Sequence, residues 1–283
     1  MRQTRQVVLF TALAMLAFAG NSLLCRVAFV RTGIDAASFT SIRLLSGAIV
    51  LWLIVALKQQ KIDAAGSWYS ALALFAYAAC FSFAYVSLTA ATGALLLFGA
   101  VQTTMIGFGL WNGERLQGRQ LAGLMLAVGG LLGLLLPGLS APPLPAAALM
   151  LGAGVAWGVY SLRAKGAADP TRTTAGNFMR AVPFAAALSV IMLGRLSLDG
   201  AGILLAVASG GLASGVGYAI WYTALRGLNA TSAATVQLSV PVIAAFGGVA
   251  FLGEAMSLRL LITSIAILGG IALITLASRR AKR

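Results

Sequence analysis

Aromatic side chains at helical spacing are the strongest candidates for contact with a small molecule in this sequence. Residues three or four positions apart share one face of a helix, so each set of rings below forms a single surface. The sets are Tyr77, Phe81 and Tyr85; Tyr218 and Tyr222; and Trp157 and Tyr160. We interpret these rings as pocket lining; core packing and an interfacial aromatic belt are the alternatives.

Amide side chains occur inside apolar segments at Asn21, Gln102 and Gln237. Buried amides need hydrogen-bond partners, so they either join helices or hold the polar groups of a substrate. Amides and tyrosine hydroxyls beside aromatic rings suit a zwitterion with an aromatic or bulky apolar side chain. The predicted substrate-binding residues are Asn21, Tyr77, Phe81, Gln102, Trp157, Tyr160, Tyr218 and Gln237.

The acidic residues are placed where they cannot relay protons through the middle of a membrane. All six lie in predicted loops or at the ends of apolar segments. Because proton-coupled pumps usually hold an ionisable group in the pathway, we predict a facilitator without a dedicated proton-relay carboxylate. Histidine is absent and both cysteines lie in apolar segments. We therefore predict no metal site, no catalytic residue and no cofactor.

Four charged residues are predicted to have structural roles. Arg43 and Arg180 lie about one to two helical turns inside the membrane near opposite faces. We expect their side chains to reach the interface and tie helix ends to loops, with a carboxylate clamp or a gate as the alternative. Glu114 and Glu254 each lie at a helix junction. We expect each to pair with the arginine five residues downstream or to face the positive N-terminus of the next helix.

Membrane-spanning helices are the elements that must position these residues. Hydrophobic residues make up 60% of the 283 positions and charged residues 9%, with a mean hydropathy of +0.95, which excludes an ordinary soluble domain. Apolar stretches of about 20 residues recur, the length at which a helix spans the bilayer. The ten predicted spans are 7–26, 38–57, 67–89, 92–111, 118–137, 144–163, 174–194, 202–225, 231–251 and 257–277.

The first span also has the pattern of a cleavable signal peptide. We expect it to be a retained helix, because nine further spans follow and it has a counterpart in the second half of the chain. With the N-terminus inside, 14 of the 20 Lys and Arg residues fall in inner segments and four in outer loops. This asymmetry predicts that both termini are cytoplasmic. It explains the net charge of +14 without nucleic acid, so the expected partners are the bilayer and a small molecule. The oligomeric state is left open.

The two halves of the chain, residues 1–140 and 141–283, repeat each other at an offset of 137 to 140 positions. The matched pairs include Gly113 and Gly253, Glu114 and Glu254, Arg43 and Arg180, and Tyr85 and Tyr222. Each half holds five spans, so the second half must enter the membrane upside down. Inverted repeats are a recurring plan of secondary transporters. The sequence thus predicts an all-α integral membrane protein of ten helices in two inverted five-helix repeats.

The paired Gly-Glu motifs, the arginines within spans and the segment LSVPVIAAFGGVAFLGE around Pro241 resemble the drug/metabolite transporter superfamily. More narrowly, they resemble its ten-helix EamA-type branch, over essentially the whole chain. The overall sequence is also similar to exporters of aromatic amino acids. In the first half, Val101 stands at the position of Pro241, so the two halves need not bend equally.

The resemblance implies a bacterial inner-membrane carrier that exports amino acids, aromatic ones in particular, by alternating access. A broad-specificity drug or metabolite efflux protein of the same fold is the alternative. The sequence offers no nucleophile–base pair within the spans, which argues against an intramembrane enzyme. A purely structural membrane subunit is also disfavoured, because such a subunit would not need an inverted repeat. We expect Tyr85 and Tyr222 to lie near alternating gates, and Pro241 to bend its helix and assist gating.

Overall fold

The computed structural model describes residues 2–59, 65–113, 118–138, 141–164, 167–228, 233 and 236–280. All regular elements within these ranges are helices. They are α1 (Arg2–Arg31), α2 (Ala36–Leu57), α3 (Trp68–Tyr85), α4 (Ala90–Trp111), α5 (Gly118–Leu135), α6 (Leu144–Ala164), α7 (Pro170–Ile191), η1 (Leu193–Arg195), α8 (Gly200–Val207), η2 (Ala208–Val216), α9 (Gly217–Leu225), α11 (Ser239–Leu252) and α12 (Leu258–Arg280). Glu114, with its predicted role, lies outside the described residues.

Nine helical stretches of the described chain are long and apolar enough to cross a membrane, and α11 is a shorter apolar helix. The prediction of an all-helical membrane protein is confirmed. The ninth predicted span, residues 231–251, lies partly outside the described residues; in its described part residues 233 and 236–237 are helical, and α11 begins at Ser239. The first helix extends beyond its predicted ends on both sides, through polar residues at its N-terminal end and through residues 27–31, which are apolar except for Arg31, at the other.

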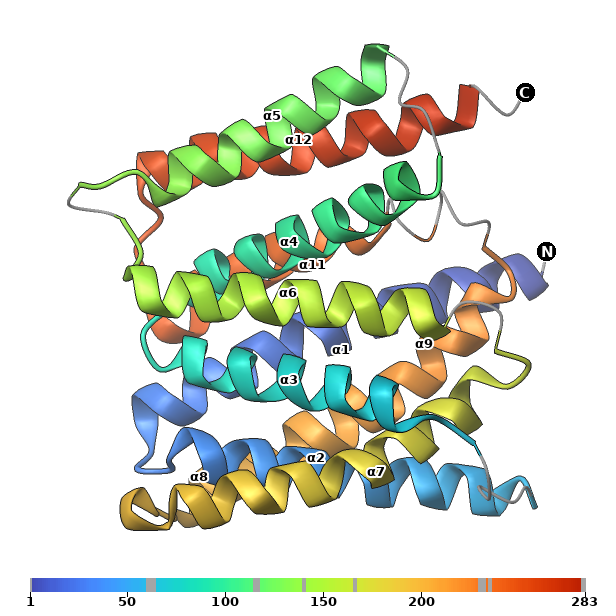
Figure 1. Ribbon diagram of the computed structural model, residues 1–283, viewed down its shortest axis with the longest axis vertical. Coiled ribbons are helices and arrows are strands. Elements are labelled where there is room, and N and C mark those ends of the chain that lie inside the picture. Colours follow the sequence, from blue (N-terminus) through green and yellow to red (C-terminus); the bar gives the residue numbers. More distant parts are fainter. Residues whose placement is uncertain are drawn as a thin grey trace.

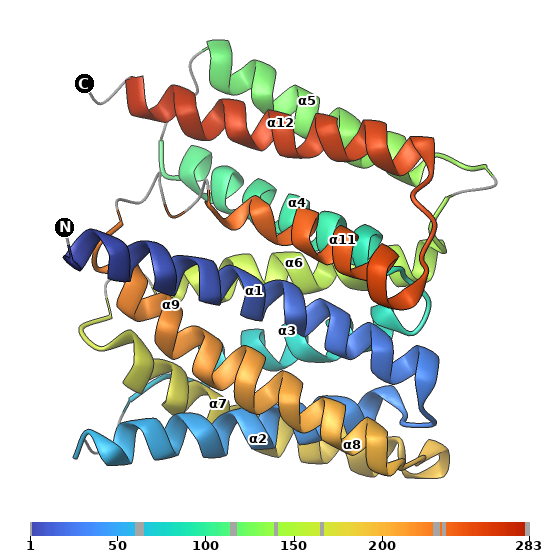
Figure 2. The same ribbon diagram turned by 180° about the vertical axis from the view of Figure 1, so that it is seen from behind.

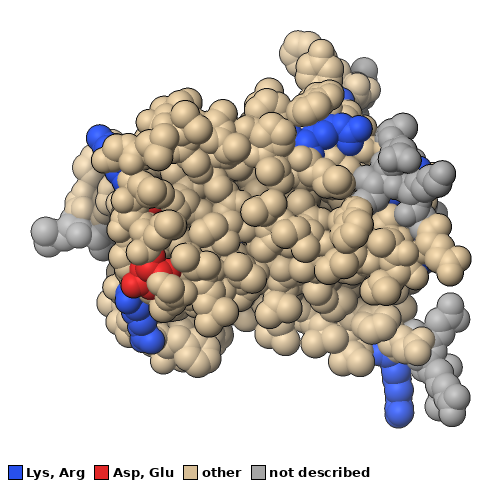
Figure 3. Space-filling view, turned by 90° about the horizontal axis from the view of Figure 1, so that it is seen from below, with Lys and Arg blue, Asp and Glu red and all other residues tan. Residues whose placement is uncertain are grey.

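The helices lie side by side in one bundle, and the chain ends lie at the same end of it (Figures 1 and 2). Helices α5 and α12 pack together along one edge, while α2 packs on α7 at the opposite edge. On the face drawn in Figure 3, charged residues gather toward the two ends of the bundle and the band between them is uncharged. This distribution is the one expected of a protein surrounded by lipid.

Aspartates begin several of the helices. Asp35 Oδ1 accepts hydrogen bonds of 2.9 Å from the backbone N–H groups of Ala37 and Ser38 at the start of α2. Asp169 and Asp199 cap α7 and α8 in the same way. Partial burial alone would raise the pKa of Asp35, but its hydrogen bonds hold that pKa below the ordinary value. These acids therefore fix helix ends and stand away from the middle of the bundle.

The repeated Gly-Glu motif has a backbone explanation at both positions. Gly113 follows α4 with φ of +85°, and Gly253 follows α11 with φ of +64°. The left-handed conformation ends a helix by satisfying its last carbonyl groups and strongly favours glycine. The N–H of Gly253 accordingly donates to the carbonyl of Val249 at 3.2 Å. The motif therefore marks the same helix ending in both halves.

One long helical stretch, from Gly200 to Leu225, contains a π-helical segment, η2, in its middle. Gly210 in this segment packs directly on α2. A Cβ atom at that position would overlap the carbonyl oxygen of Arg43 and the hydroxyl of Ser46. The close packing of this π-helical segment on α2 thus depends on a residue without a side chain, and π-helical segments often mark functional sites.

Gly210→Ala is expected to lower the free energy of unfolding by about 1–3 kcal/mol, because the new methyl group meets backbone that cannot move aside. Gly129→Ala in α5 is the matched control. Nothing lies within 4 Å of a Cβ atom at that position, and alanine is the better helix former. Melting temperatures of both purified variants in detergent measure the difference. Equal melting temperatures would contradict the close contact between η2 and α2.

Candidate functional site: a central cavity lined by aromatic rings

A cavity of about 790 Å³ lies inside the bundle, between α1, α3, α4, α6, η2 and α9. All eight residues predicted to bind substrate line it, although they come from six separate segments of the chain. They are Asn21, Tyr77, Phe81, Gln102, Trp157, Tyr160, Tyr218 and Gln237. The described residues that line the cavity include no acidic or basic side chain. The cavity is therefore large, mostly apolar and provided with a few hydroxyl and amide groups.

The cavity extends toward the end of the bundle where both termini lie. Asn112 after α4, Ala164 at the end of α6 and Leu225 at the end of α9 all line it there. At the opposite end it stops at Phe81, and Tyr85, one turn further along α3, does not line it. Tyr85 is fully buried, and its hydroxyl donates to the carbonyl of Ala90 at 3.3 Å. The two ends of the cavity are thus unequal.

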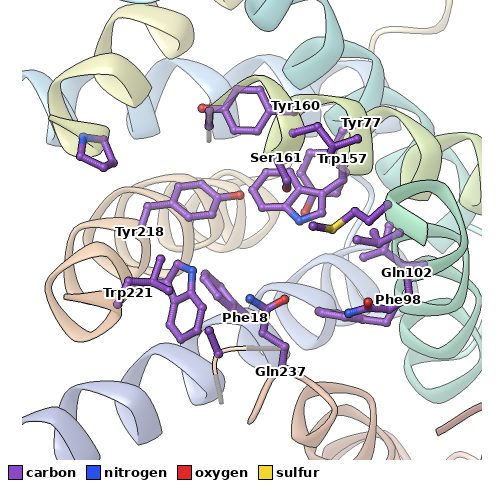
Figure 4. Close-up of a pocket in the computed structure, with 18 of the residues that line it drawn as sticks. Phe18, Tyr77, Phe98, Gln102, Trp157, Tyr160, Ser161, Tyr218, Trp221 and Gln237 are labelled. Carbon is purple, nitrogen blue, oxygen red and sulfur yellow. The ribbon is translucent and has the colours of Figure 1, made fainter. Parts of the chain in front are cut away.

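Trp157 is the centre of the aromatic wall (Figure 4). Its ring stacks on Tyr160 at 5.3 Å between centroids and on Tyr218 at 5.4 Å, and it tilts against Tyr77 at 4.9 Å. Such offset arrangements are favourable for aromatic pairs. Residue Trp157 comes from α6, Tyr77 from α3 and Tyr218 from α9. The wall therefore joins three helices that are distant in the sequence.

Four aromatic residues that were not among the predicted site residues also line the cavity, namely Phe18, Phe98, Phe108 and Trp221. Phe18 packs on Tyr218 at 5.7 Å and on Trp221 at 6.0 Å. The side chain of Trp221 is buried in the cavity wall. The spacing in the sequence could have identified Phe18 and Trp221. Phe18 lies three residues before Asn21 and Trp221 three residues after Tyr218, so each shares a helix face with a predicted cavity residue.

A buried polar network joins α1, α2, α3 and η2 beside the cavity. Arg43 Nη2 donates to the hydroxyl of Tyr77 at 3.1 Å, and Asn21 Nδ2 donates to the same oxygen at 3.4 Å. Ser209 Oγ donates to Asn21 Oδ1 at 2.6 Å. The expectation that Arg43 extends to the interface is wrong, since this residue is only 2% exposed. The physical reason is that Tyr77 and the neighbouring rings offer it partners in the interior.

The equivalent arginine of the second half behaves differently. Arg180 donates to the carbonyl groups of Ala65, before α3, and of Gly176, within its own helix. It therefore ties a helix to a neighbouring loop, as expected from the sequence. The repeat thus places two arginines at matched positions, but only Arg43 stands next to the cavity.

A second polar cluster connects the open end of the cavity to α7. The hydroxyl groups of Thr174 and Tyr222 lie 3.0 Å apart, and Tyr160 Oη donates to Thr174 Oγ1 at 3.3 Å. Asn177 Nδ2 donates to Tyr160 Oη at 3.4 Å. Tyr222 lines the cavity, whereas its repeat counterpart Tyr85 is sealed at the closed end. The two candidate gate residues therefore occupy opposite ends of the bundle.

Pro241 does not line the cavity, but it interrupts a helix next to it. Residues 236–237 are helical, Leu238 is a turn, and α11 begins at Ser239. Proline has no N–H to donate to the carbonyl four residues earlier, which belongs to Gln237. Gln237 lines the cavity. The break caused by Pro241 is therefore located at the cavity wall.

Glu254 has a different partner from the one expected. Its Oε1 accepts from Arg26 Nε at 3.1 Å, and its Oε2 accepts from the backbone N–H of Ala90 at 2.8 Å. The predicted partner, Arg259, instead donates to the backbone carbonyl groups of Leu136 and Pro137. The prediction chose the nearest arginine along the chain. In the folded protein, however, packing brings Arg26 of α1 and the N-terminus of α4 closer to Glu254 than Arg259 is.

The sequence of this chain matches the EamA-like transporter family twice, over residues 5–136 and 144–276. It belongs to the EamA-like transporter family. The prediction of this family is therefore confirmed, and the protein is a multi-pass membrane transporter; the family is one of transporters rather than enzymes. One of the two matches falls in each half of the chain.

One relative of this EamA-like transporter is a protein of Pseudomonas aeruginosa that carries the name Uncharacterized protein PA1977. The two are 58% identical over 271 residues, which covers 95% of this chain and 94% of the relative. A solved structure titled "Crystal structure of protein" is similar over 97% of this chain and 99% of its own, with a TM-score of 0.70. At 20% sequence identity, that likeness shows the fold alone.

Proposed function

We propose that this protein is an inner-membrane carrier that exports amino acids, aromatic ones in particular, by alternating access. The observation that carries the proposal is the cavity itself. Its wall of stacked rings and its uncharged polar groups match an amphipathic molecule with a flat apolar part and no net charge. The similarity of the overall sequence to the aromatic amino acid exporter YddG points the same way.

Alternating access is supported by the relation between the two halves, residues 1–140 and 141–283. Repeat-related helices pack on each other, with α2 on α7, α4 on α11 and α5 on α12. In addition, α3 packs on α6, and the helices that correspond to them in the other half, α9 and α1, also pack on each other. Helix α1 starts at the end that holds the termini and α6 starts at the other end (Figure 1). An inverted pair of this kind can exchange conformations and so open the cavity to each side in turn.

The cavity reaches the end with the termini, and the distribution of Lys and Arg predicts that this end faces the cytoplasm. The conformation described above is then the one that takes substrate from inside the cell. In this state Tyr85 belongs to the closed gate and Tyr222 to the open one. The break at Pro241 provides a point where the second half can bend. The described lining of the cavity holds no acidic residue, which supports transport down the gradient of the substrate.

Flux into liposomes that contain only the purified protein tests this function. We expect saturable uptake of labelled phenylalanine and tryptophan without a pH gradient, at rates above that of alanine. Flux that requires a proton gradient would contradict the facilitator mechanism. Equal transport of cationic dyes would favour broad-specificity efflux. Unchanged flux from both sides in Tyr85→Ala and Tyr222→Ala would contradict their assignment as gates.

A further inference from the structure

Arg43 carries a positive charge into the bundle without an acidic partner among the described residues. The ion pair that those residues form joins Arg26 to Glu254, at the closed end of the cavity. Arg43 Nη1 has no hydrogen-bond partner within the described part of the chain. An unpaired buried charge inside a membrane protein is costly, and such residues usually serve the pathway of a substrate or an ion.

The charge of Arg43 acts on the cavity through its wall. The guanidinium carbon lies 5.2 Å from the centre of the Tyr77 ring and 4.8 Å from that of Phe81, and both rings line the cavity. These cation–π contacts hold the charge directly behind the wall. Arg43 therefore does not reach the cavity itself, but it sets the electrostatic potential at that part of the surface.

Arg43 and Asn21 leave the hydroxyl of Tyr77 available to a ligand only as a hydrogen-bond donor. Its hydroxyl oxygen accepts from Arg43 at 3.1 Å and from Asn21 at 3.4 Å. A phenol oxygen that accepts two hydrogen bonds keeps only its own proton to offer to a ligand. The adjacent positive charge strengthens that O–H as a donor, because hydrogen bonds in a network polarise one another at low dielectric.

We propose that Tyr77, positioned by Arg43 and Asn21, is the subsite that binds the carboxylate of the transported molecule. A negatively charged acceptor is stabilised by both the hydroxyl and the charge behind it, and no described acidic residue of the lining cancels that effect. A cationic group is repelled from the same place. The inference rests on the proposed carrier function and narrows its substrates to molecules that carry a carboxylate.

The second half of the chain does not duplicate this subsite. The position matched to Tyr77 at an offset of 137 is Ser214, and the matched arginine, Arg180, binds backbone carbonyl groups elsewhere. The pseudo-symmetric cavity therefore has a carboxylate subsite on the side of α3 only. The stacked rings of Trp157 and Tyr218 lie beside it and suit the apolar part of the same molecule.

The experiment compares three compounds that share one aromatic ring: phenylalanine, phenylalaninamide, which lacks the carboxylate, and 3-phenylpropionate, which lacks the amine. Initial rates are measured in liposomes with wild-type protein, with Tyr77→Phe and with the control Tyr160→Phe. Both variants remove one hydroxyl from a cavity tyrosine and keep the ring. The hydroxyl of Tyr160 bonds Thr174 and Asn177 and not Arg43.

We expect Tyr77→Phe to lower the rates of both carboxylates about tenfold relative to phenylalaninamide, the loss typical of a hydrogen bond to a charged group. Tyr160→Phe is expected to leave the ratio of rates unchanged. Arg43→Met should lower the same ratio, and Arg43→Lys should restore part of it, because the charge returns. A merely structural role for Arg43 would change all three rates together.

Three results would distinguish failure of this inference from failure of the carrier function. If wild-type protein shows no saturable flux of any of these compounds, the proposed carrier function itself fails. If phenylalanine and phenylalaninamide are carried equally well, and Tyr77→Phe does not alter their ratio, the carboxylate subsite is overturned while the carrier stands. An equal fall of the ratio in Tyr160→Phe would also overturn it, since any lost cavity hydroxyl would then have the same effect.

Discussion

Replacing Trp157 by alanine is expected to lower the initial rate of phenylalanine transport at low substrate concentration by about 10- to 100-fold. The ring of Trp157 contacts Tyr77, Tyr160 and Tyr218, with centroids 4.9 to 5.4 Å away. Each aromatic pair contributes about 0.5–1.5 kcal/mol beyond the burial of its area. The truncation removes these contacts and the flat surface that an aromatic substrate would use.

Trp52→Ala is the matched control for this measurement. Trp52 lies on α2, its side chain is 48% exposed, and it is not among the cavity-lining residues. Both variants lose the same number of atoms, so a general effect of removing tryptophan would appear in both. Trp157→Phe should retain an intermediate rate, because a smaller ring still stacks. A Trp157→Ala protein with wild-type rate and apparent affinity would contradict the assignment of the wall to substrate binding.

Replacing Arg26 by alanine is expected to open the closed end of the cavity. Cys25, the preceding residue, is fully buried and provides a native reporter. In a Cys80→Ser background, its reaction with a membrane-impermeant maleimide should accelerate by about 10- to 100-fold, as expected for the loss of a partly buried ion pair. Mass spectrometry of the purified protein after timed exposure measures the rate.

The contacts of Arg26 explain why its loss should open this end. Besides the ion pair with Glu254, its Nη1 donates to the carbonyl groups of Tyr85 and Val86 at 3.0 Å each. Glu254 in turn holds the N–H of Ala90 at the start of α4. One arginine thus connects α1, the end of α3, the start of α4 and the loop after α11. Because these contacts join four elements at this end, removing the arginine favours the open conformation.

Arg259→Ala provides the control at the same end of the bundle. Arg259 ties the start of α12 to the backbone after α5, at Leu136 and Pro137, and contacts neither α1 nor α3 through these bonds. We expect the labelling rate of Cys25 to stay at the wild-type value in this variant. An unchanged rate in Arg26→Ala, or an equal rise in Arg259→Ala, would show that the Arg26 contacts do not hold the cavity closed.

Some residues could be assigned from the sequence because their physics is local. The spacing of Tyr77, Phe81 and Tyr85 places them on one helix face whatever the rest of the chain does. An apolar stretch of about 20 residues must be helical in lipid, since its backbone groups have no other partners. The paired Gly-Glu motifs at 113 and 253 could be found in the sequence, and the structure shows a left-handed glycine at the end of a helix at both positions.

Other residues depend on neighbours that only folding supplies. From the sequence, Arg43 was expected to extend toward the interface, but in the structure Tyr77 and Phe81 of α3 pack against it. Glu254 was expected to pair with Arg259, but α1 brings Arg26 within 3.1 Å of it. The sequence by itself determined the membrane helices, the repeat and the polar and aromatic side chains available to a substrate. The tertiary structure decided which charges meet and which end of the cavity is closed, because a buried charge takes the nearest partner in space and not the nearest along the chain.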